Sequence, residues 1–156
     1  MNIEKTREYY KNPEVCSCEY CKNFVSHVRA EYPEFSKYLE SIGIDAEKPH
    51  ECAPLYLENG VYHYALVQYV VIGSGEGFAT ESIGGVEMRI TDSHPTVDTD
   101  DEFFVIETGM MTLPWTGGDD EEDIGNTVKA NSLFSKTIRK IKKNEKTHKR
   151  RDTDRA

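Results

Sequence analysis

A turn signal followed by a long apolar run places the strongest constraint on the fold of this chain. Asn59 and Gly60 both tolerate the positive φ of a type I′ turn, and they predict a hairpin between residues 55–57 and 61–64. The run over residues 61–72 is β-branched and aromatic on both alternate faces. Such a run is typical of a strand that is covered on each side. We therefore expect a central strand with its hairpin partner beside it.

Further strands are expected after this hairpin. Apolar and polar residues alternate over residues 86–91, and a fourth strand is expected over 102–108. Residues 110–115 either extend that strand or form a fifth. The glycine-rich stretch 73–78 lacks the last glycine of a dinucleotide-binding fingerprint and has no good helix after it, so we interpret it as a loop.

Two short helices are expected before the hairpin. Tyr20, Phe24 and Val28 recur at helical spacing, and a second helix is predicted to begin at Pro33. Residues 2–11 could form another short helix, although they carry no clear apolar stripe. Helices followed by consecutive strands with short connections predict an α+β fold with a mostly antiparallel sheet of four to five strands.

The charge is divided unevenly along the chain, whose net charge is −9. Residues 1–123 carry 8 Lys or Arg against 25 Asp or Glu, a balance of −17, whereas residues 124–156 carry 11 against 3, a balance of +8. This asymmetry predicts one globular domain over residues 1–116. Residues 117–156 are expected to be an acidic linker and a basic tail that is partly helical or disordered.

The tail and the acidic body suggest different partners. The basic residues within 136–151 could neutralise the phosphates of a nucleic acid or another anionic surface. Equally, they could fold back on the acidic body. We expect another protein as the main partner, because the acidic body would steer a basic surface toward it. The sequence does not indicate an oligomeric state.

The chain shows no sign of export or of membrane insertion. No apolar run reaches the length of a membrane span, and residues 1–5 lack the apolar core of a signal peptide. We therefore expect a cytoplasmic protein, in a reducing compartment where cysteines remain as thiols.

Three cysteines lie within six residues, at positions 16, 18 and 21. Zinc takes four tetrahedral ligands, and the Cys18-x-x-Cys21 spacing presents two thiolates on one side of a turn. Cys16 can supply the third. The fourth ligand is expected from one of three residues: Cys52 first, and otherwise His50 or His27. This pattern predicts a structural zinc site.

Two other interpretations of the cysteines stay open. Cys18 and Cys21 could form a thiol redox switch, with Cys16 available for exchange. No strand precedes Cys18 to build the βαβ unit on which such redox motifs usually lie. Alternatively, the cysteines are small hydrophobic residues that bind nothing.

A metal-dependent hydrolase is the remaining alternative. Asp92 and His94 follow a predicted strand, and His63 lies on the central strand. Together they could supply the ligands of a catalytic metal or an acid/base pair. The simpler interpretation is an Asx-turn beside a surface histidine.

Three short motifs resemble those of a family of small uncharacterised bacterial proteins. They are V-C-x-C-x-x-C-x-N-F at residues 15–24, S-I-G-I-D at 41–45 followed by Lys48-Pro49, and D-S-H-P at 92–95. The resemblance covers about residues 12–115 and implies no activity. The three thiols belong to the family pattern, but Cys52 and the basic tail do not. The sequence as a whole favours a non-enzymatic interaction domain stabilised by a cysteine cluster.

Overall fold

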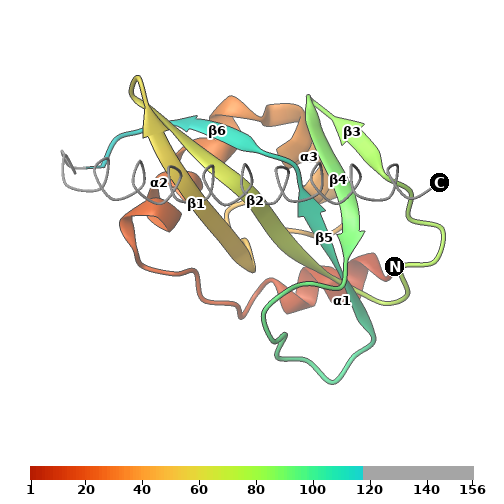
Figure 1. Ribbon diagram of the computed structural model, residues 1–156. Coiled ribbons are helices and arrows are strands. Elements are labelled where there is room, and N and C mark those ends of the chain that lie inside the picture. Colours follow the sequence, from red (N-terminus) through yellow and green to blue (C-terminus); the bar gives the residue numbers. More distant parts are fainter. Residues whose placement is uncertain (118–156) are drawn as a thin grey trace, which may run out of the picture. The chain divides into compact units, whose positions relative to one another are not determined.

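The computed structural model describes residues 1–117, which form three helices followed by six strands. The helices are α1 (Ile3–Tyr9), α2 (Glu19–Glu31) and α3 (Pro33–Ser41). The strands are β1 (Glu51–Glu58), β2 (Val61–Ile72), β3 (Glu81–Ile83), β4 (Val86–Thr91), β5 (Phe103–Thr108) and β6 (Met111–Pro114). Helices that precede a run of antiparallel strands confirm the predicted α+β class (Figure 1).

Internal contacts divide the chain into two units, Met1–Gly118 and Asp119–Ala156. The predicted basic tail, including the segment 136–151, lies outside the described residues. Within residues 1–117, no helix combines the length and the apolar character that crossing a membrane requires.

The strands form one antiparallel sheet in the order β1-β2-β5-β4-β3, with β6 beside β2. Gln68 of β2 lies opposite Glu107 of β5. Tyr64, four residues earlier on β2, lies opposite Met111 of β6, which is four residues after Glu107. The pairing of β2 therefore continues from β5 to β6 without a shift in register. Residues 110–115 were expected either to extend the preceding strand or to form a new one, and β6 is a separate strand that continues the line of β5.

The predicted hairpin joins β1 to β2. Asn59 and Gly60 have φ values of 52° and 76°, and Glu58 lies opposite Val61. Both turn residues thus adopt the left-handed conformation that a type I′ turn needs. Because β2 pairs with β1 on one edge and with β5 and β6 on the other, it is the central strand that the sequence predicts.

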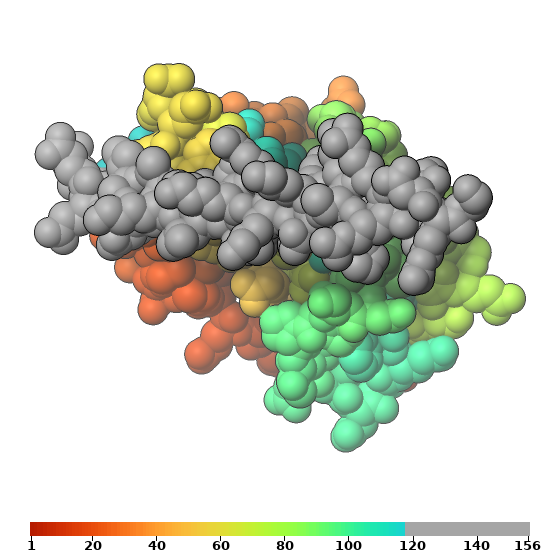
Figure 2. Space-filling view, in the orientation of Figure 1, coloured from red at the N-terminus to blue at the C-terminus, as the bar shows by residue number. Residues whose placement is uncertain are grey.

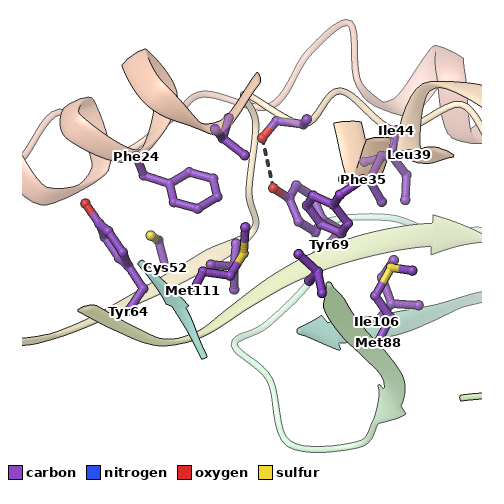
Figure 3. Close-up of a cluster of buried hydrophobic side chains, with 14 of the residues drawn as sticks. Phe24, Phe35, Leu39, Ile44, Cys52, Tyr64, Tyr69, Met88, Ile106 and Met111 are labelled. Atoms are coloured by element: carbon purple, nitrogen blue, oxygen red, sulfur yellow. Dashed lines mark hydrogen bonds between the residues drawn. The ribbon is translucent and has the colours of Figure 1, made fainter. Parts of the chain in front are cut away.

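The main core lies between α2, α3 and one face of the sheet. Phe24 of α2 and Phe35 of α3 are fully buried, each edge-on to a tyrosine of β2. These partners are Tyr64 and Tyr69 (Figure 3). The ring centroids of Tyr64 and Phe24 are 5.5 Å apart, and those of Tyr69 and Phe35 are 6.1 Å apart. The Tyr69 hydroxyl donates to the Ala46 carbonyl at 2.9 Å, so the buried ring leaves its polar atom paired.

Helix α1 covers an edge of β2 that no strand within residues 1–117 reaches. Pairing with β1 ends where Glu51 lies opposite Gln68, and β2 runs on to residue 72. Val70 is fully buried, so its backbone groups need partners. The Tyr10 hydroxyl supplies both, accepting from the Val70 N–H at 3.0 Å and donating to the Val70 carbonyl at 3.1 Å. The short helix that residues 2–11 could form is therefore present as α1, and its buried side is polar.

The same helix also satisfies the backbone of Ile72. Thr6 Oγ1 accepts from the Ile72 N–H at 3.1 Å, and the Asn2 N–H donates to the Ile72 carbonyl at 2.7 Å. Close approach of α1 depends on Gly43, which has a φ of +88°. A Cβ atom there would lie 2.5 Å from the Ile3 carbonyl oxygen, so only glycine fits this contact.

The glycine-rich residues 73–78 form a loop, as predicted, and no helix follows the loop in the described chain. The backbone instead enters β3, a strand of three residues that was not predicted. Ile83 of β3 lies opposite Val86 of β4. The turn between them is made by Gly84 and Gly85, whose φ values are +57° and +81°.

Replacing Tyr10 by Phe should lower the free energy of unfolding by about 2 kcal/mol, because two buried backbone groups of Val70 would lose their partner. Tyr32 offers a matched control, since its hydroxyl bonds in the same way to the N–H and carbonyl of Thr112 at 3.0 and 3.1 Å. Thr112 is exposed, so water can replace that hydroxyl and Tyr32→Phe should cost less than about 1 kcal/mol. Urea unfolding measures both; equal losses would contradict the role given to Tyr10.

Candidate metal centre

The thiols of Cys16, Cys18 and Cys21 meet at the start of α2. Cys18 is the residue that caps the helix, with an extended backbone at φ −68° and ψ 160°. Its sulfur accepts the N–H of Cys21 at 3.5 Å, a contact that a serine or aspartate oxygen makes at many helix starts. The Cys16 sulfur in turn accepts from the backbone N–H of Cys18. Hydrogen bonds from backbone N–H groups therefore hold the three sulfurs near one another without a metal.

The three sulfur atoms all lie within 4.8 Å of one another. In a tetrahedral zinc site with Zn–S bonds of about 2.3 Å, neighbouring sulfurs are about 3.8 Å apart. Small side-chain rotations would therefore bring the sulfurs to that spacing. Among the described residues, no other set of three Cys, His, Asp or Glu ligand atoms lies this close together.

Cys52 of β1 lies beside this cluster on the core side. Its side chain is buried among Phe24, Tyr64 and Met111 (Figure 3). The thiols of Cys52 and Cys21 share a hydrogen bond, which raises the pKa of Cys21 and acts together with its burial. Figure 2 shows the gold surface at the start of β1 next to the red-orange surface of the segment between α1 and α2. Four thiols, two exposed and two buried, are thus brought together.

The environment of each exposed thiol differs. The pKa of Cys16 is lowered, chiefly by the hydrogen bond from the Cys18 backbone N–H and then by bonds from the Cys18 and Cys21 thiols. The pKa of Cys18 is raised, chiefly by burial of its sulfur, while the Cys21 N–H opposes that effect. Cys16 therefore holds a thiolate more readily than its neighbours do.

A buried polar network fixes the first turn of α2 against the sheet. The Asn23 side-chain amide donates to the Tyr64 hydroxyl at 3.2 Å and to the Pro114 carbonyl at 3.0 Å. Its oxygen accepts the Thr116 N–H at 3.0 Å. The Tyr64 hydroxyl donates to the carbonyl of Tyr20 at 2.9 Å. Sequence reasoning missed this network; its only signal was an asparagine between apolar positions of a predicted helix.

The two histidines considered as alternative fourth ligands have partners elsewhere. His27 Nε2 lies 3.1 Å from Thr116 Oγ1, and His50 Nε2 lies 3.1 Å from the carbonyl oxygen of Pro95. Neither histidine belongs to a ligand cluster within residues 1–117. Of the three proposed fourth ligands, the structure places Cys52 against Cys21.

The hydrolase interpretation of Asp92, His94 and His63 needs correction, because these residues do not form a ligand cluster in the described part of the chain. His63 stacks on Tyr56 near the hairpin, with ring centroids 4.2 Å apart. Asp92 follows Thr91, the last paired residue of β4, which lies opposite Val105 of β5; Val105 in turn lies opposite Val70 of β2. Along β2, Val70 is seven residues from His63, a distance of about 23 Å.

His94 lies near His50 instead of His63. The centroids of the two imidazole rings are 6.4 Å apart, and His94 Nδ1 lies 2.7 Å from the Pro95 carbonyl oxygen, which His50 also contacts. The D-S-H-P segment is held to β2 as well, because Gln68 Nε2 donates to the carbonyl of Ser93 at 2.8 Å. This bonding anchors the loop and places His94 beside His50 and away from His63.

In metal-free protein, alkylation by iodoacetamide should modify Cys16 first, then Cys18, and Cys21 and Cys52 last. The lowered pKa of Cys16 gives it more thiolate at neutral pH, and its rate should stop rising at a lower pH than that of Cys18. Burial slows the other two. Peptide mass spectrometry over a time course gives the order, and faster labelling of Cys21 than of Cys16 would contradict this account.

Comparison with protein-family models, with curated proteins and with solved structures finds no match for this chain. The resemblance to a family of small bacterial proteins therefore stays a prediction. What the site can do has to be inferred from its own geometry.

Proposed function

We propose that this protein is a non-enzymatic interaction domain stabilised by a zinc ion on Cys16, Cys18, Cys21 and Cys52. The observation that supports it most is the meeting of four thiols, three of them with sulfurs within 4.8 Å of one another and the fourth hydrogen-bonded to Cys21. Four thiolates are a donor set typical of structural zinc. Metal binding would displace the thiol protons.

The donor set favours a structural role over a catalytic one. Catalytic zinc keeps one coordination position open for water or substrate, and four protein thiolates leave none. The cluster also joins two distant parts of the chain, since Cys52 lies on β1 and the other three lie at the start of α2. A metal there would tie the irregular segment between α1 and α2 to the edge of the sheet.

Protein purified without a histidine tag should contain about one zinc per chain. Replacing Cys18 by Ser should remove most of this zinc and lower the melting temperature by at least about 5 °C, because metal-binding energy contributes to folding. Ser17→Ala is the matched control, since it alters the same exposed segment and leaves all four thiols in place. Metal analysis and thermal unfolding measure the two effects.

Absence of metal in the unaltered protein, with four thiols that react freely, would refute the zinc site. A Cys18→Ser protein that kept its zinc and its melting temperature would refute the role of Cys18. Cys18 is not part of the buried cluster that holds Phe24, Phe35, Tyr64 and Tyr69, so the variant is expected to remain folded and measurable.

The proposed partner of this domain is a protein with a basic surface. Residues 1–117 carry 8 Lys or Arg against 20 Asp or Glu, a balance of −12. Several cations are already paired: Arg29 alone bonds to the carboxylates of Glu40, Asp45 and Glu47. The remaining acidic charge would attract a basic surface and speed its association.

Polylysine serves as a probe for this acidic surface. The full chain should bind it in low salt and lose at least about tenfold in affinity on moving from about 50 mM to about 300 mM salt, because exposed charges are screened. Polyglutamate is the control. Calorimetry in which polyglutamate bound and polylysine did not would assign binding to the basic residues within 136–151 and contradict the proposed partner.

A further inference from the structure

The four thiols are divided by exposure in a way that structural zinc does not require. Cys16 and Cys18 are exposed, whereas Cys21 and Cys52 are buried, at 7% and 6% of their possible surface. Exposed thiolates are open to oxidants. Half of this donor set is therefore accessible to small reactive molecules.

Cys18 and Cys21 are also positioned to join to each other. Their sulfurs belong to the group within 4.8 Å, and Cys18 Sγ already lies against the N–H of Cys21. Residues three apart at a helix start have Cβ atoms about 5–6 Å apart, so a disulfide needs only a small movement. Cys16 and Cys18 are two residues apart, a spacing whose small ring strains a disulfide. Cys16–Cys21 also joins an exposed thiol to a buried one within 4.8 Å, but Cys18 is the cysteine whose sulfur the Cys21 N–H holds at the helix start.

We propose that this cluster is an oxidation site, at which a hydroperoxide converts Cys18 and Cys21 to a disulfide and releases the metal. The metal-release part rests on the proposed zinc site, whereas the disulfide needs only the two thiols. The oxidant reaches both exposed thiols, Cys16 as well as Cys18, and Cys21 lies close enough to Cys18 to resolve the product formed there.

The reaction balances with hydrogen peroxide as the oxidant. The Cys18 sulfur attacks one peroxide oxygen, so that an S–O bond forms, the O–O bond breaks, and the departing hydroxide takes up a proton to give water. The Cys21 sulfur then attacks the Cys18 sulfur, forming the S–S bond and expelling a second hydroxide, which also becomes water. The two cysteines lose two electrons, and the peroxide is reduced to two waters.

The structural effect should remain local. A disulfide removes two of four ligands, and the remaining thiols of Cys16 and Cys52 take up protons as the metal leaves. Asn23 still holds the first turn of α2 to the sheet through Tyr64 and Pro114, and this network contains no sulfur. Oxidation therefore frees the segment between α1 and α2 and leaves the sheet and its core intact.

The experiment treats the zinc-loaded full chain with a modest excess of hydrogen peroxide. Released zinc is followed with a coloured chelator, and disulfides are mapped by peptide mass spectrometry. The expected result is about one zinc released for each Cys18–Cys21 disulfide formed, with recovery on adding dithiothreitol and zinc. Ser17→Ala should behave like the unaltered chain.

Two variants separate the parts of the proposal. Cys52→Ser keeps Cys18 and Cys21 and should still form their disulfide, even when it binds zinc weakly. Cys21→Ser should form none at Cys18 and should instead accumulate sulfinic acid.

Metal content before treatment distinguishes the two proposals. A chain that holds no zinc refutes the zinc site, and metal release with it. Zinc that survives peroxide, zinc lost with only sulfinic or sulfonic acids formed, or a Cys16–Cys18 bond in place of the expected one would each refute the oxidation site and leave the zinc site standing.

Discussion

The hydrogen-bonding requirement of β2 is the constraint on which the rest of the domain depends. This strand has 12 residues, whereas the strands that pair with it have 4 to 8, and its backbone has to be paired along two edges in a buried environment. Three strands supply most of the partners. Where β1 ends, side-chain oxygens of Tyr10 and Thr6 replace a strand. Without them β2 would present an open edge of the kind that attracts other chains.

This arrangement explains where the cysteines lie. Helix α1 is held on the edge of β2, and α2 is held on the sheet face through Asn23. The connection between them therefore has both ends fixed while its middle lacks regular structure. Cys16 and Cys18 lie on this connection, and Cys21 and Cys52 attach it to β1. A metal there would stabilise the part of the N-terminal region that receives least support from the core.

Patterns within short stretches of sequence predicted most of the fold. Asn59 and Gly60 located the hairpin, and the alternation of side chains located β4. The packing of α1 could not be predicted in this way, because its contact with β2 is made through the side-chain oxygens of Thr6 and Tyr10 and not through an apolar stripe. Strand β3 escaped prediction because three residues are too few to show a period.

Only those residues of the site that lie close together in sequence could be predicted to meet. Spacing alone brings Cys16, Cys18 and Cys21 together, since they share one turn. The approach of Cys52 depends on how β1 lies against α2, and the separation of His63 from His94 depends on strand order and register. Such long-range geometry leaves no trace in residue spacing. For the same reason, His50 and His27 stayed open as alternatives to Cys52 until the fold was known.

The cover on β2 also has a consequence for synthesis of the chain. Tyr10 and Val70, whose contact closes the open edge, are 60 residues apart in sequence. Domains begin to fold from the N-terminus as the ribosome extends them. The residues that protect the edge have therefore left the ribosome well before the edge itself emerges. When β2 emerges, Thr6 and Tyr10 are therefore already available to bond to its edge. This limits the time in which a neighbouring nascent chain could pair with that edge.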